Sequence, residues 1–235
     1  MKSKLNLICV WFCLLCTALS LSACAWSAKT NQMIAENYIS SKHGPNFQIT
    51  GYEPPVDSAS GMRPARVHVE QNGFQYSLGI QDGKVIEDSY SENYAGKIVL
   101  DTIFDKLKQS NTCPDLAGRK IETGCIVLVT DPTLLEIPID LSGAKDYNDI
   151  LLSANQAGGM ASAYITVRIL DNADYRSEEW LYDLYLICQD ELESYDLSVA
   201  LADGGMNFVH WGNAGGAPGP KEATVSMEEF YAKFY

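Results

Sequence analysis

Two turn signals set between alternating segments constrain the fold of this chain more than any other feature. Asn72-Gly73 and Asp82-Gly83 are dipeptides favoured in two-residue hairpin loops, because type I′ turns need a positive φ at both positions. Apolar and polar residues alternate over 65–70 and 74–80, on either side of the first signal, and also over Phe47–Tyr52. The sequence therefore predicts an antiparallel meander with one apolar and one polar face.

Two helices are predicted around this meander. The first covers Asn31–His43, where apolar residues recur at helical spacing, and Gly44-Pro45 ends it. The second covers Asn93–Gln109 and is expected to pack on the apolar face of the meander. Residues 31–112 are thus expected to form a small α+β roll, and α+β is the fold class predicted for the chain.

Residues 113–235 are expected to form a second subdomain of α/β, sandwich-like architecture. Strands are predicted at Cys125–Thr130, Tyr164–Leu170, Leu197–Leu201 and Phe208–Trp211. Helices are predicted at Asp146–Gln156, with Asp146 as the N-cap, and from Ser226 onward, where Ser226 and Glu229 match a capping box. Ser177–Glu193 fits both helical spacing and strand alternation, and its length and acidic start favour a helix.

Residues 1–23 have the pattern of a secretory signal peptide. Met1–Lys4 carries two lysines and no acid, and Leu5–Leu21 is almost wholly apolar. Leu21-Ser22-Ala23-Cys24 then resembles the lipobox of bacterial lipoproteins, in which the matching cysteine is lipidated after cleavage. This resemblance implies that Cys24 becomes the lipidated first residue, with 24–30 as a tether. An ordinary signal peptide with a chance cysteine, or an uncleaved anchor, is the alternative.

Composition restricts the partners of the mature chain. There are 17 Lys and Arg residues against 30 Asp and Glu, and loss of Lys2 and Lys4 with the signal takes the net charge from −13 to −15. Such acidity argues against a nucleic-acid partner, which needs a basic face, and against electrostatic docking on anionic lipid. The expected location is the extracytoplasmic face of the cell membrane, reached through the lipid anchor.

No motif assigns a catalytic residue, a metal or a cofactor. The common zinc, nucleophile-elbow, phosphate-loop, dinucleotide and paired-cysteine motifs are not found in residues 24–235, which follow the predicted signal peptide. Ser142-Gly-Ala-Lys145 matches the S-x-x-K pattern, but its partner motifs are missing, and Ser142-Gly143 favours a turn. His43, His68 and His210 stand far apart in the sequence, whereas a metal site needs several converging ligands.

Trp211, flanked by His210 and followed by a Gly- and Pro-rich stretch, is the candidate binding patch. Aromatic side chains on loops bury large areas on binding with little loss of conformational entropy. Ordinary core aromatics are the alternative interpretation.

Cys113 and Cys125 form a predicted disulfide. They stand 12 positions apart, and the stretch between them contains Pro114, Gly118 and Gly124, which can bend its ends together. Export would expose both thiols to an oxidising compartment, where they tend to pair. Two independent reduced thiols are the alternative.

The helix end Tyr38–Gly44, the strand Arg66–Glu70 and the turn Asp82–Val85 are similar to those of uncharacterised small α+β lipoproteins of Gram-positive-type bacteria, and more remotely to cystatin-like modules. The resemblance implies no activity. We therefore expect a lipid-anchored, non-enzymatic binding or interaction module whose partner is an envelope protein or a small ligand. An envelope hydrolase without a recognisable motif, or an inhibitor or immunity-type protein acting on an envelope enzyme, is the alternative.

Overall fold

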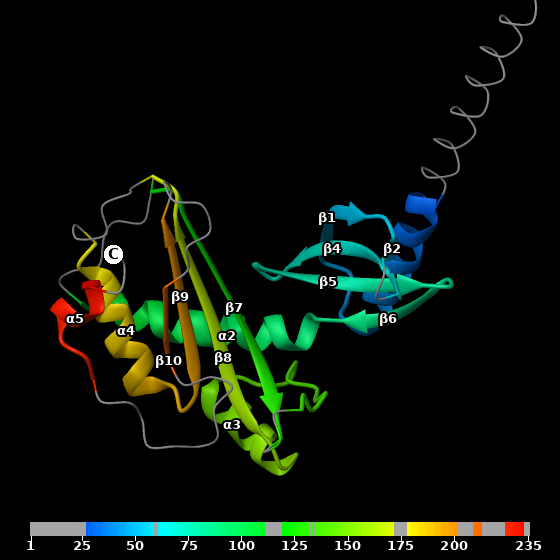
Figure 1. Cartoon of the computed structure of the whole chain (residues 1–235). Coiled ribbons are helices and arrows are strands. Elements are labelled where there is room, and N and C mark those ends of the chain that lie inside the picture. Colours follow the sequence, from blue (N-terminus) through cyan, green and yellow to red (C-terminus); the bar gives the residue numbers. More distant parts are fainter. Residues whose placement is uncertain are drawn as a thin grey trace, which may run out of the picture. The chain divides into compact units, whose positions relative to one another are not determined.

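The computed structural model describes residues 27–58, 61–110, 119–131, 133, 135–171, 178–201, 209–212 and 224–232 (Figure 1). The chain divides into two compact units, Met1–Ser89 and Tyr90–Tyr235. The first unit combines a helix with an antiparallel sheet, and the second combines a mixed sheet with helices. The predicted α+β class is therefore confirmed.

The first unit contains a helix over residues 27–42 and a four-stranded antiparallel sheet. Its strands are β1 (Phe47–Glu53), β4 (Ala65–Gln71), β5 (Phe74–Gln81) and β6 (Lys84–Asp88), in the order β1-β4-β5-β6. Two further strands, β2 (Val56–Ser58) and β3 (Gly61–Arg63), pair as a small hairpin between β1 and β4 in the chain.

Both predicted hairpin turns of the meander are confirmed. Asn72 and Gly73 have φ values of 52° and 80°, and Asp82 and Gly83 have 51° and 73°. These left-handed values are those of type I′ turns, and each turn joins directly paired strand ends.

The first helix covers the apolar face of this sheet. Val67, Leu78 and Ile80 alternate along β4 and β5 as buried residues, and Ala35 and Ile39 of the helix are fully buried. The helix includes residues 27–30, which the sequence suggested to be part of a tether. The tether is therefore at most residues 24–26.

The second unit is built on a mixed sheet. It comprises α2 (Tyr90–Leu107), β7 (Ile121–Thr130), α3 (Tyr147–Gln156), β8 (Met160–Ile169), α4 (Trp180–Glu191), β9 (Tyr195–Leu201), β10 (Val209–Gly212) and α5 (Met227–Ala232). The strand order is β10-β9-β8-β7; β8 and β9 run parallel and are joined through α4, whereas the other neighbours are antiparallel.

Helix α2 belongs to this second unit. Its buried residues Ala95, Val99, Ile103 and Leu107 share a core with β7, β8 and α4. The boundary between the compact units in the chain therefore falls between Ser89 and Tyr90, whereas the sequence predicted a boundary after residue 112. An amphipathic stripe identifies which face of a helix is buried but not which sheet will cover it.

Local signals in the second unit are confirmed. Within the segment Ser177–Glu193, residues Trp180–Glu191 form helix α4, as the length of the segment suggested. Asp146 caps α3 by accepting a hydrogen bond from the Asp149 backbone N–H. Ser226 and Glu229 form the predicted capping box at the start of α5. Within the described residues, no helix is both long and apolar enough to span a bilayer.

Candidate functional site

The structure describes only part of the residues singled out from the sequence. Cys24 and Cys113 lie outside the described residues. The backbones of His210 and Trp211 belong to the outer strand β10, where they pair with β9, but their side chains lie outside what is described. Lipidation and the aromatic patch therefore stay predictions.

Cys125 on β7 and Cys188 on α4 have buried side chains in the same core. Burial raises the pKa of both thiols well above the usual value, so neither is an activated nucleophile. Because Cys113 is not described, its pairing with Cys125 stays a prediction. Mass spectrometry of the exported protein, alkylated with and without reductant, would show whether Cys113 and Cys125 are linked.

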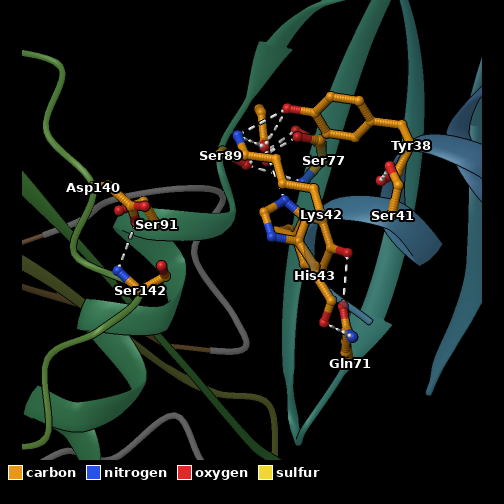
Figure 2. Close-up of polar contacts among 12 residues, drawn as sticks. Tyr38, Ser41, Lys42, His43, Gln71, Ser77, Ser89, Ser91, Asp140 and Ser142 are labelled. Carbon is orange, nitrogen blue, oxygen red and sulfur yellow. Dashed lines mark hydrogen bonds and ion pairs between the residues drawn. The ribbon is translucent and has the colours of Figure 1, made fainter. Parts of the chain in front are cut away.

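The main polar cluster of the first unit gathers around one carboxylate oxygen (Figure 2). Oδ2 of Asp88 accepts hydrogen bonds from Tyr38 Oη and Lys42 Nζ, each at 2.9 Å, and lies 2.9 Å from His43 Nε2. Lys42 Nζ also donates to Tyr38 Oη at 2.9 Å. We call these four residues the Asp88 cluster. Its His43 and Asp88 side chains are only 6% and 13% exposed.

The geometry of the first helix and the way in which this helix ends position the donors of the cluster. Tyr38 and Lys42 are four residues apart and therefore share one face of the helix. His43 follows the last helical residue, where Gly44 adopts a φ of 95° that L side chains rarely allow. The buried Gln71 side chain then donates to the carbonyl oxygens of His43 and Gly44. These bonds satisfy carbonyls that the helix end leaves without an intrahelical partner.

The electrostatics of the Asp88 cluster favour a structural tie between the helix and β6. Burial raises the pKa of Tyr38, so its hydroxyl stays protonated and donates to the carboxylate. Hydrogen bonds to Tyr38 and Asp88 raise the pKa of Lys42, so its ammonium stays charged. Neither the Tyr38 hydroxyl nor the Lys42 ammonium is therefore prepared to exchange a proton near neutral pH.

Sequence reasoning missed this cluster in part. His43 was expected near the helix end, and the four-residue spacing of Tyr38 and Lys42 could have suggested a shared partner. No local signal connects them to Asp88, which follows 45 residues after His43. The convergence depends on tertiary packing, which brings the end of β6 to the end of the first helix.

A second polar cluster lies in the second unit around Arg119. Its guanidinium contacts Asp171 through Nε at 2.8 Å and Glu178 through Nη2 at 2.6 Å. Glu178 also accepts a hydrogen bond from the Trp180 indole, and its own side chain is only 3% exposed. The Arg119 hydrogen bonds lower the pKa of Asp171 to about 2. This arrangement pairs the buried carboxylate of Glu178 with the guanidinium of Arg119.

The S-x-x-K pattern does not form a nucleophile site. The Ser142 backbone N–H donates to Asp140 Oδ1 at 2.9 Å, and Ser142 lies in a turn before α3 (Figure 2). The chemistry requires a serine at the start of a helix, with lysine one turn later. In the described part of the chain, no group of three or more metal-binding side chains converges.

An open groove of about 410 Å³ lies at one end of the first unit. This groove is lined by residues 45–48, which follow the first helix, and by residues 70–73, which form the end of β4 and its turn. Asn46, Glu70 and Asn72 supply amide and carboxylate groups, which suits a ligand that is bound through hydrogen bonds. We call this feature the polar groove.

No protein-family model matches this chain. A crystal structure of a DUF5037 family protein from Ruminococcus gnavus ATCC 29149 is similar at 14% sequence identity, over 71% of this chain and 73% of that chain, with a TM-score of 0.36. At this level of identity and overlap, the similarity assigns neither a site nor an activity to this chain.

Proposed function

We propose that this protein is a lipid-anchored, extracytoplasmic binding module without catalytic activity of its own. The observation that carries the proposal is that the groups in the described polar clusters are bonded to one another. Asp88 and Arg119 each centre a set of mutually satisfied groups, and the buried thiols of Cys125 and Cys188 have raised pKa values. Such groups stabilise a fold and leave surface recognition as the role that this body supports best.

The anchor half of the proposal rests on Leu21–Cys24 and on the signal-like pattern before it. Two or more acyl chains would hold the protein stably, whereas one chain binds a membrane only marginally. Metabolic labelling with a palmitate analogue should mark the wild-type chain and not Cys24→Ser. Equal labelling of the two chains would contradict lipidation at this residue.

The binding half is tested at the polar groove. A photo-crosslinking amino acid placed at the exposed Asn46 should yield adducts with an envelope protein or a small ligand in intact cells. The same group at Glu36, on the exposed side of the first helix, is the matched control. Equal adduct patterns at both positions would show that the groove has no preferred ligand, and the aromatic patch at His210 and Trp211 would then be probed in the same way.

A further inference from the structure

The short connection between Cys24 and the first helix limits how far the first unit can stand from a lipid anchor. The helix is already formed at Ser27, so three residue steps join it to Cys24. At about 3.6 Å per step these residues span at most about 11 Å. We propose that the end of the first unit that carries the helix start rests on the lipid surface. This inference depends on the lipidation of Cys24 proposed above.

Contacts within the unit identify what else lies at this end. Asn31 Nδ2 donates to Tyr52 Oη at 3.1 Å, which places the start of the helix near the end of β1. Strand β1 ends at Glu53, and after two prolines β2 begins at Val56, which pairs with Arg63 of β3. The β2–β3 hairpin therefore continues from the β1–β4 ladder at the anchor-side end, and we call it the projecting hairpin. The polar groove lies at the other end of the same ladder.

The projecting hairpin exposes apolar side chains. Met62 is 60% exposed and Val56 is 42% exposed. Met62 pairs with Asp57, one position along from the Val56–Arg63 pair, so the two apolar side chains point to opposite faces of the hairpin. Two strands alone are only marginally stable in water. Shallow insertion would bury an apolar side chain from each face, while Arg63 could reach lipid phosphates.

The charge at this end permits contact with lipid although the whole chain is acidic. The charged residues near the helix start, the projecting hairpin and the β5–β6 turn are Lys29, Arg63 and Lys84 against Glu53, Asp57 and Asp82. Three cations balance three anions, so anionic headgroups meet no net negative charge here. The excess acidity of the chain comes from residues other than these six.

The test uses the purified, lipidated full chain in vesicles of phosphatidylcholine and phosphatidylglycerol. A diazirine amino acid replaces Met62, and the matched control carries it at Gln75, an exposed residue near the polar-groove end. Because the short connection holds position 62 at the lipid surface, lipid adducts should be roughly tenfold more abundant at 62 than at 75.

A longer connection gives a second readout. A flexible Gly/Ser spacer of about 12 residues, inserted between Trp26 and Ser27, has a typical end-to-end distance of about 19 Å. It should lower the adducts at position 62 several-fold while the lipid mass on Cys24 stays unchanged. Equal adducts at 62 and 75 in lipidated protein would overturn this inference alone. Intact mass without lipid on Cys24 would overturn the proposed anchor and this inference together.

Discussion

Single residues in this protein stabilise contacts between distant parts of the chain. Asp88 joins the end of the first helix to β6 through three donors on one oxygen atom. Arg119 joins the start of β7 to Asp171 and to Glu178, which precedes α4. In both clusters a charge that is largely removed from water has a partner of opposite sign, which buried charges require. These residues therefore act on stability.

The variant Asp88→Asn should lower the free energy of unfolding by about 2 kcal/mol, because hydrogen bonds to a charged group in a shielded site are lost. Glu87→Gln is the matched control on the same strand. Glu87 is 49% exposed and pairs with the equally exposed Arg66, so this change should cost less than about 0.5 kcal/mol. Urea unfolding of both variants measures the difference, and equal losses would contradict a structural role for the Asp88 cluster.

The carboxyl group of Asp171 should titrate near pH 2, because Arg119 donates two hydrogen bonds to its charged form. Its pKa is lower in the folded chain than the ordinary value of about 3.9. The carboxylate therefore stabilises the fold above about pH 4, and this contribution is lost as the pH falls through about 2. Carboxyl carbon shifts in an NMR titration measure the midpoint. Arg119→Lys should raise it, and a wild-type midpoint near 4 would contradict the pairing.

At the scale of elements, α2 and β7 of the second unit come very close together at Gly96. A Cβ atom built on Gly96 would lie 1.9 Å from the carbonyl oxygen of Cys125. Only glycine lets the helix backbone come this near to the strand. This contact lies beside the core that α2 shares with β7 and α4, so the spacing of α2 and β7 affects the packing of that core.

The variant Gly96→Ala should therefore destabilise the second unit by about 3 kcal/mol, because backbone atoms have to separate to admit the methyl group. Gly124→Ala, on β7 itself, is the control. A Cβ atom at Gly124 meets no other atom within 4 Å, so this change should cost less than about 0.5 kcal/mol. Thermal or urea unfolding would show the contrast, and similar stabilities would mean that α2 can shift away from β7 without cost.

At the scale of the whole molecule, the chain contains two compact units with separate sets of buried residues. In the first unit, Ala35 and Ile39 of the helix are buried with Val67 and Leu78 of the sheet. In the second, helices α2 and α4 share a core with β7, β8 and β9. A local loss of stability in one unit should therefore stay within that unit.

Hydrogen exchange of Asp88→Asn should reveal this independence. Amides of β4 and β5 in the first unit should exchange faster than in the wild-type chain, because the helix that covers their sheet loses a tie. Amides of β8 in the second unit should keep their wild-type rates. Gly96→Ala is the reciprocal variant, expected to affect β7 and β8 but not β4. Equal acceleration in both units would indicate one cooperative fold.

Much of the local structure was determined by the sequence alone. Asn72-Gly73 and Asp82-Gly83 formed the predicted turns, because positive φ angles are a property of those residues wherever they stand. The Asp146 cap and the Ser226–Glu229 capping box were predicted for the same reason, since each bond spans only three residues. Strand alternation likewise indicated the buried face of the first sheet.

Tertiary structure decided which surfaces and side chains meet. The stripe of α2 was visible in the sequence, but the sheet that covers it belongs to the second unit. His43 contacts Asp88 across a separation of 45 positions in the sequence, and Arg119 contacts Glu178 across a separation of 59 positions. Spacing within one element carries no information on such pairs, because they depend on how whole elements pack. The sequence therefore indicated the elements and their buried faces, and the packing of those elements created the polar clusters.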